Sequence, residues 1–232
     1  MKKAIVTGAS SGIGHAITQR LLDLGYNVIG ISRRIDAKLF ATEHFSAVQC
    51  DLSDEKQTLQ LLQTLKNEEC SLLVNCAGFG KFAPHEELDP KTIIKMSFLN
   101  LTAPMLLTNT FLKSLKKNNG YLININSIEA LRSSKFAGVY SATKAGLKAF
   151  SDALFEETRK SDLSITNINP DMTQSGFYDD LHFDVHDDEN AKLLASDIAD
   201  AVQHILEMRK GAVVADYTIR SLHFGITKKF KK

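Results

Sequence analysis

The stretch Ala4-Ile5-Val6-Thr7-Gly8-Ala9-Ser10-Ser11-Gly12-Ile13-Gly14 joins an apolar run to a glycine-rich turn. Residues 4–6 have the character of a buried strand, and apolar residues then recur at helical spacing from Ile13 to Leu24, where Gly25 follows. In such a strand–turn–helix unit, glycines let the backbone approach a phosphate, and the helix N-terminus offers unsatisfied N–H groups and positive potential. The spacing G-x-x-x-G-x-G leaves a structural turn as the alternative, but its position after the first strand favours a dinucleotide site.

Apolar strand-like runs alternate with helical patterns along the rest of the chain. Further strands are expected at 28–31, 47–50, 72–74, 121–126 and 163–168, and at 212–214 with 217–219. Helices are expected in a short segment before residue 47, after a cap at Asp54, over 90–117 with a bend at Pro104, over 139–159, and from Ser196 or Asp197. Repeated strand–helix units of this kind predict an α/β fold, with about seven mainly parallel strands covered by helices on both faces.

Composition limits the possible classes of protein. A chain of 232 residues with 44% hydrophobic residues is expected to form one domain over 1–232. The net charge of +1 predicts no nucleic-acid surface, and the basic end at 228–232 is expected to be a frayed tail, with a membrane or nucleic-acid contact as the alternative. No apolar run is long enough to span a bilayer, and three cysteines without paired spacing favour a reducing, cytoplasmic location.

A serine, a tyrosine and a lysine form a candidate catalytic group. Tyr140 and Lys144 are four residues apart on an expected helix, so both lie on one face. An ammonium beside a phenol is expected to lower the phenol pKa from its ordinary value of about 10. Ser127, at the end of the fifth expected strand, is placed to hold a carbonyl oxygen beside that phenol.

The end of the second expected strand distinguishes between two nicotinamide cofactors. An acidic residue there would accept a hydrogen bond from a ribose 2′-hydroxyl, whereas a 2′-phosphate requires cationic donors. The sequence is Ser32-Arg33-Arg34, and the first acid is Asp36. This pattern favours NADP(H), with Arg33 as the leading contact; the alternative is that both arginines only solvate a loop.

Together these motifs resemble the short-chain dehydrogenase/reductase family over nearly the whole chain, which implies a Rossmann-type doubly wound sheet. The residues 7–14 match its glycine motif, Asp51-Leu52 its adenine site and Asn75-Cys76-Ala77-Gly78 its Asn-Asn-Ala-Gly motif with cysteine in second place. Asn100, Ser127, Tyr140 and Lys144 match its catalytic positions. The expected cofactor contacts are Gly8, Ser10, Ser11, Gly12, Ile13, Gly14, Ser32, Arg33, Arg34, Asp51, Leu52, Asn75, Ala77, Gly78, Tyr140, Lys144, Pro170, Thr173 and Ser175.

The resemblance implies a carbonyl–alcohol oxidoreductase. Tyr140 would exchange a proton with the substrate oxygen, Ser127 would orient that oxygen, Lys144 would tune Tyr140 and hold the ribose, and Asn100 would support a proton relay through water. It also implies a homodimer or homotetramer, consistent with a broad apolar surface over 93–115. The alternative is a dinucleotide-binding sensor or scaffold without turnover, which would have no need of the four catalytic residues.

One departure from the family pattern follows the sixth strand. The family usually has Pro-Gly there, whereas this chain has Pro170-Asp171, and Ser175 stands where a threonine is usual. By register, Thr173 would present its backbone to the nicotinamide carboxamide. The aspartate leaves the local conformation and the charge of the pocket open.

The residues 174–195 lack a clean period and are expected to form a mobile segment over a substrate cleft. Its aromatic residues, with 79–82 and 128–130, would accept a moderately apolar carbonyl compound, but the sequence does not select one. His182 and His186, four residues apart, raise the possibility of a metal. A solvated lid is favoured instead, because the chemistry needs no metal and no third ligand converges.

Overall fold

The computed structural model describes residues 2–229, which form a seven-stranded parallel sheet in the order β3-β2-β1-β4-β5-β6-β8. The chain builds outward from β1 to β3 and then returns to place β4 on the other side of β1, which is the doubly wound pattern expected. The strands are β1 (Lys3–Thr7), β2 (Asn27–Ser32), β3 (Phe45–Gln49), β4 (Leu72–Asn75), β5 (Tyr121–Ile125), β6 (Ser164–Pro170) and β8 (Asp216–Ile219).

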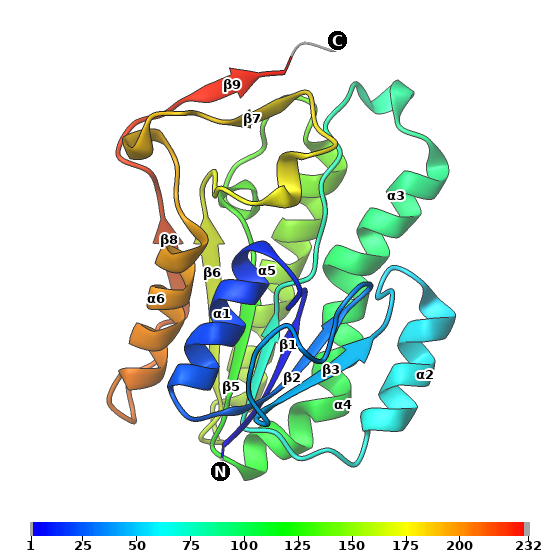
Figure 1. The fold of residues 1–232 in the computed structure, drawn as a ribbon. Coiled ribbons are helices and arrows are strands. Elements are labelled where there is room, and N and C mark those ends of the chain that lie inside the picture. The colour runs from blue at the N-terminus through cyan, green and yellow to red at the C-terminus, as the bar shows by residue number, and fades with distance from the viewer. Residues whose placement is uncertain (1, 230–232) are drawn as a thin grey trace.

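Helices cover both faces of this sheet (Figure 1). They are α1 (Gly12–Asp23), α2 (Glu55–Leu65), α3 (Pro90–Ser97), α4 (Ala103–Lys117), α5 (Gly138–Thr158) and α6 (Ala195–Glu207). Residues of α1 and α6 share one apolar core with the sheet, and residues of α2, α4 and α5 share the other. Because both faces are covered, the central strands are almost wholly buried, as in β4, where all four residues are inaccessible.

The predicted long helix over 90–117 is interrupted. Its two halves, α3 and α4, are joined by a wide π turn, Phe98–Thr102. Pro104 has no N–H to donate to the carbonyl of Asn100 four residues earlier, so the regular helical ladder cannot continue through this point. The turn places Asn100 in the protein interior, where it is 1% exposed.

Two sequence predictions of secondary structure are wrong. The residues 33–44 form turns and bends rather than a short helix, because the Asp36 carboxylate accepts from the Lys38 N–H and the Phe40 ring packs on His15 and Phe45. The residues 212–214 are not part of a strand, and only β8 completes the sheet. The predicted cap of α2 is confirmed, since the Asp54 carboxylate accepts from the Gln57 N–H at 2.9 Å.

A second, antiparallel sheet of two short strands, β7 (Phe183–Val185) and β9 (Ile226–Lys228), lies beyond the carboxyl end of the main sheet (Figure 1). Lys229 extends this pairing, since its N–H donates to the His182 carbonyl and its ammonium contacts Asp184 at 2.9 Å. Lys228 and Lys229, expected in a frayed tail, therefore contact the segment 174–195. The rest of that predicted tail, residues 230–232, lies outside the described residues.

Four single-turn 3-10 helices complete the described secondary structure: His85–Glu87, Ile128–Ala130, Gly176–Tyr178 and Glu189–Ala191. Within residues 2–229, no helix combines the length and the apolar character that crossing a bilayer requires.

Because helices cover the sheet, substitutions of a buried and an exposed leucine should affect stability differently. Leu115 of α4 is fully buried against the sheet, whereas Leu222 is 81% exposed. We expect Leu115→Ala to lower the free energy of unfolding by about 2–5 kcal/mol and Leu222→Ala to change it by less than about 0.5 kcal/mol, measured by urea denaturation. Equal effects of the two substitutions would contradict this packing.

Candidate active site

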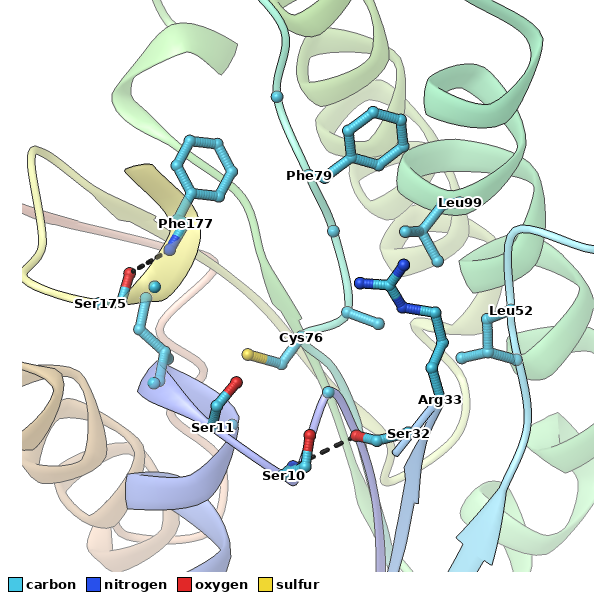
Figure 2. A pocket seen from close by; sticks show the side chains of 18 of the residues that line it. Ser10, Ser11, Ser32, Arg33, Leu52, Cys76, Phe79, Leu99, Ser175 and Phe177 are labelled. Carbon is cyan, nitrogen blue, oxygen red and sulfur yellow. Dashed lines mark hydrogen bonds between the residues drawn. The ribbon is translucent and has the colours of Figure 1, made fainter. Parts of the chain in front are cut away.

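A pocket of about 510 Å³ opens where the carboxyl ends of the parallel strands meet (Figure 2). This is the position at which open α/β sheets bind ligands, beside the switch in strand order between β1 and β4. Most of the predicted cofactor residues line it: Gly8, Ser10, Ser11, Gly12, Ile13, Gly14, Ser32, Arg33, Arg34, Asp51, Leu52, Ala77, Gly78, Tyr140, Pro170, Thr173 and Ser175.

The glycine turn forms the floor of this pocket. Gly8 and Gly12 have positive φ angles of 72° and 54°, a conformation that favours glycine. A Cβ atom on Gly14 would lie 2.3 Å from the Gly8 carbonyl oxygen, so the turn requires glycine there as well. Ser11 caps α1 without a side-chain hydrogen bond, and the first turn of α1 has no acidic residue. The first N–H groups of this helix therefore remain available to an anion.

Cations gather at the end of β2. Figure 2 shows the Arg33 guanidinium extending into the pocket between Leu52 and Leu99. The Ser32 hydroxyl accepts from the Ser10 N–H at 3.2 Å and so ties the end of β2 to the glycine turn. Asp36 is exposed and bound to its own loop through Lys38, away from the pocket lining.

The loop after β4 is fixed to the end of β1. The Thr7 hydroxyl oxygen accepts from the N–H groups of Cys76 and Ala77, both at 2.9 Å. Asn75, predicted as a cofactor contact, does not line the pocket. Its amide donates to the Asn124 side chain at 2.8 Å inside the core, because this end of β4 faces β5.

A second cavity of about 630 Å³ adjoins the first. The two cavities share five lining residues: Ser127, Tyr140, Asp171, Phe177 and Tyr178. The second cavity is walled largely by aromatic and aliphatic side chains from the loop after β4, the segment 174–195 and the region of β9. The predicted association of 174–195 with a cleft is thus seen in the geometry, while its mobility stays a prediction.

Tyr140 and Lys144 are both buried on the same face of α5. Burial raises the pKa of Tyr140 to about 12, with the Ser127 hydroxyl acting in the opposite direction. Burial also lowers the pKa of Lys144 to about 8. The predicted lowering of the Tyr140 pKa by Lys144 is therefore not found in the isolated chain. The reason is geometric: the Lys144 ammonium donates to the Ile125 carbonyl at 2.9 Å and lies 5.9 Å from the centre of the phenol ring.

Asn100 and Lys144 lie behind the pocket wall rather than on it. A Cβ atom on Gly78 would lie 3.1 Å from the Asn100 Oδ1 and 3.6 Å from the Lys144 Nζ, so both polar groups pack against that glycine. The Asn100 amide donates to the Phe79 carbonyl at 2.9 Å and its Oδ1 accepts from the Phe79 N–H at 3.1 Å. Asn100 thus fixes the backbone of Phe79, which lines the first cavity.

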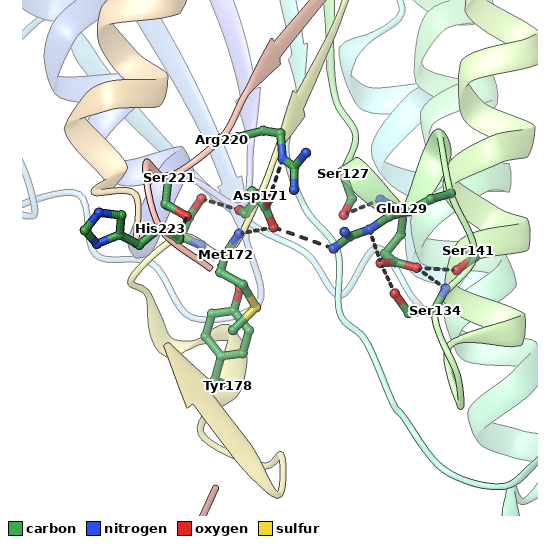
Figure 3. A network of polar contacts seen from close by, with 12 residues as sticks. Ser127, Glu129, Ser134, Ser141, Asp171, Met172, Tyr178, Arg220, Ser221 and His223 are labelled. Carbon is green, nitrogen blue, oxygen red and sulfur yellow. Dashed lines mark hydrogen bonds and ion pairs between the residues drawn. The ribbon is translucent and has the colours of Figure 1, made fainter. Parts of the chain in front are cut away.

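The departure at Asp171 has a structural explanation (Figure 3). The buried Asp171 carboxylate accepts from the Met172 N–H at 3.0 Å and from the Arg220 Nε at 3.1 Å. The Arg132 Nη2 lies 3.8 Å from it. An aspartate therefore links the end of β6 to residues that follow β5 and β8. The Thr173 N–H, predicted to face a carboxamide, donates to the Tyr178 hydroxyl at 3.3 Å.

Some pocket residues were not singled out from the sequence. They include Lys95, Leu99 and Asn126 in the first cavity and Arg132 in the second, whereas Phe79 and Gly80 belong to the segment 79–82 that was expected to wall the cleft. Asn126 could have been found, because it immediately precedes Ser127 at a strand end. Lys95 and Arg132 come from segments with no motif, and only the folded chain brings them to the site.

The two histidines of the segment 174–195 are not arranged as a metal site. The His186 Nδ1 accepts from the Asp188 N–H at 3.1 Å. Over residues 2–229, no group of three His, Cys, Asp or Glu side chains gathers at distances suited to one metal ion.

The strand order, the glycine turn at the switch point and the pocket above it define a nucleotide-binding class of α/β protein. The family model for short chain dehydrogenases matches residues 2–186. The chain belongs to the short-chain dehydrogenase/reductase family.

Relatives and solved structures support this membership. The chain is 31% identical to dehydrogenase/reductase SDR family member 11 of Gallus gallus, with 94% of each chain covered. It is 30% identical to a probable NADP-dependent dehydrogenase of Haemophilus influenzae, with 82% of this chain and 79% of that protein covered. Its fold matches the alcohol dehydrogenase of the archaeon Thermococcus sibiricus, complexed with 5-hydroxy-NADP, at a TM-score of 0.85 and 26% identity, covering 96% and 97% of the two chains.

The burial of Lys144 predicts a pH-dependent stability. Because the folded protein lowers its pKa from 10.5 to about 8, the unfolded chain holds more protons on this residue between those values, and stability rises with pH across that window. Lys144→Met removes the cost of a buried ammonium but also its hydrogen bond to Ile125. We expect the variant to be more stable than wild type by about 1–3 kcal/mol at neutral pH, and the difference to shrink towards pH 10 in urea denaturation. A difference that is constant with pH would contradict the lowered pKa.

Proposed function

We propose that the protein is an NADP(H)-dependent oxidoreductase that interconverts a carbonyl and an alcohol by hydride transfer. The observation that carries the proposal is the shared wall of the two cavities, where Ser127 and Tyr140 face both. A cofactor in the first cavity and a substrate in the second would meet at these two hydroxyl groups.

The residues of the first cavity fit a nicotinamide dinucleotide. The turn at Gly8, Gly12 and Gly14 is too tight for a Cβ atom, which at each position would lie within 3.1 Å of another protein atom. The free N-terminus of α1 suits a pyrophosphate. When bound, the nicotinamide would supply or accept the hydride. Asp51 and Leu52 line the same pocket and would contact the adenine.

The preference for a 2′-phosphate rests on the cations at the end of β2. Arg33 and Arg34 line the pocket, Lys95 of α3 adds a third positive side chain, and Ser32 provides a hydroxyl. No acidic residue of the β2–β3 loop lines the pocket to bind a 2′-hydroxyl in its place, since Asp36 is held by its own turn.

Four side chains carry the proposed chemistry. In reduction, the Tyr140 phenol gives a proton to the carbonyl oxygen, and its raised pKa keeps it protonated at neutral pH. Ser127 orients the same oxygen by a hydrogen bond. Lys144, with its pKa near 8, exchanges a proton close to neutrality and can restore the phenol, while Asn100 holds the backbone beside it. Oxidation of an alcohol runs through the same groups in reverse.

The remaining expectations are part of the same proposal. The residues 1–232 act as one catalytic domain in which 174–195 is a mobile wall of the substrate cavity. The protein works as a homodimer or homotetramer built on 93–115, which is supported by Ile94, a large apolar side chain that is 67% exposed. The free thiols of Cys50, Cys70 and Cys76 suit a reducing cytoplasm.

The role of Tyr140 is tested by removing only its hydroxyl. Tyr140→Phe should lower turnover of carbonyl substrates by about 10²- to 10⁴-fold, because the proton donor is lost, while NADPH affinity stays within about twofold. Tyr121→Phe, at the start of β5 and outside both cavities, is the matched control and should leave turnover unchanged. Nicotinamide absorbance measures turnover and NADPH fluorescence measures binding. Substantial activity in the Tyr140 variant would refute its assigned role.

The cofactor preference is tested at Arg33. Arg33→Ala should weaken NADPH binding by about 10- to 100-fold through loss of charge-assisted hydrogen bonds, and leave NADH binding unchanged. Lys38→Ala removes a cation from the same loop but outside the pocket, and should change neither affinity. An unchanged ratio of NADPH to NADH affinity in the Arg33 variant would exclude Arg33 from the phosphate site.

A further inference from the structure

The substrate cavity has one polar feature that the proposed reaction does not use. Arg132 lines the same cavity as the Ser127 and Tyr140 hydroxyls, and its side chain is 42% exposed. Its surroundings in the cavity are mainly apolar, with Phe136, Phe177 and other aromatic side chains in the wall. An arginine in such a wall is costly unless its charge has a partner.

Glu129 fixes Arg132 from the protein side. The Glu129 carboxylate is nearly buried and accepts from the Ser134 N–H, the Ser134 hydroxyl and the Ser141 hydroxyl at 2.9, 2.6 and 2.9 Å. It also accepts from the Arg132 Nε at 3.3 Å. These hydrogen bonds keep the pKa of the Glu129 carboxyl below its usual value even though burial acts in the opposite direction. A fully bonded carboxylate thus holds the inner edge of the guanidinium in one orientation.

The outer edge of the guanidinium remains available. Among the described residues, neither Nη atom of Arg132 makes a hydrogen bond, and the Asp171 carboxylate forms only a long ion pair with Nη2, at 3.8 Å. That acid is already bonded to Arg220, which is outside the cavity lining, so its charge has its own partner. A planar, positioned fork of donors of this kind is suited to bidentate binding of a carboxylate.

The other charged side chains that line the cavity do not prevent an anion from binding there. Lys135 and Lys228 also line the cavity. Its acidic lining residues are Glu129 and Asp171, which already accept hydrogen bonds from other donors, and the exposed Glu87. The Lys135 ammonium lies 4.8 Å from the centre of the Phe136 ring and is directed at that ring. Arg132 is therefore the cation that shares its cavity wall with the proposed catalytic hydroxyls and retains free donors.

We propose that Arg132 binds a carboxylate of the substrate, so that the substrates are oxo acids and hydroxy acids with an apolar body. This inference rests on the proposed function and gives it a substrate class. The reacting oxygen lies at Ser127 and Tyr140, the carboxylate lies at Arg132, and the apolar chain fills the aromatic cavity. Glu129 is a positioning residue, because it acts on the substrate only through Arg132.

The inference is tested by binding to the NADP⁺-saturated protein, without requiring turnover. Octanoate and octanamide have nearly the same shape and differ in charge. By calorimetry, wild-type protein should bind octanoate at least 10-fold more tightly, and Arg132→Met should remove this preference by weakening octanoate alone by about 10- to 100-fold. Arg132→Lys keeps the charge without the fork and should give an intermediate loss. Lys135→Met, a cation removed from the same cavity, should retain the preference.

A second arm measures turnover of 5-oxohexanoate and its methyl ester with NADPH. The Arg132→Met variant should lose kcat/KM for the acid, mainly through KM, and keep that for the ester. The inference is overturned if wild type shows no preference for the acid, if Arg132→Met weakens octanoate and octanamide equally, or if Lys135→Met has the same effect. If the ester is turned over and the acid is not preferred, the proposed function stands and the inference about Arg132 is removed. If neither the acid nor the ester is turned over, the result counts against the proposed function alone.

Discussion

The site depends on the Thr7 hydroxyl, which accepts from two successive N–H groups of the loop after β4. This contact joins β1 to β4 at the point where the strand order reverses, and the backbone that it holds lines the first cavity. With the end of β1 fixed in this way, the glycine turn and the loop 76–78 approach closely enough that a Cβ on Gly8 would lie 3.1 Å from Ala77. A parallel sheet supplies the strand ends, but this hydrogen bond sets their spacing around a ligand.

Burial, rather than pairing with an opposite charge, governs the pKa values of the two ionisable groups at the centre of the site. Burial raises the pKa of Tyr140 and lowers the pKa of Lys144, because it disfavours the charged form of each side chain. Each is consequently neutral more often than it would be in water. The site thus holds a protonated phenol beside an amine that can gain or lose a proton close to neutral pH, which is a suitable pair for moving one proton at a time.

The sequence alone predicted the features that depend on interactions between residues close together in the chain. The cap at Asp54 and the glycine turn follow from hydrogen bonding and backbone conformation within a few residues, and the structure has them as predicted. The first six predicted strands of the sheet are also present, with ends that differ from the predicted ones by at most about two residues. The sequence did not predict features that arise from distant contacts. Phe40 packs between His15 and Phe45 and prevents a helix, and β7 pairs with β9 from more than forty residues away. The placement of Arg132 against Asp171 likewise depends on the ends of two strands meeting, and the pKa of Tyr140 depends on how much of the fold covers it.

The five residues common to both cavities would make ligand binding in one cavity depend on ligand binding in the other. A ligand that fixes the Tyr140 and Phe177 rings in one cavity also fixes part of the wall of the other, so the second ligand meets a surface whose rotamers are already restricted. By linkage, any factor by which the first ligand tightens the second is matched by an equal factor in the reverse direction. A common wall of this kind would couple the binding of two ligands within one chain.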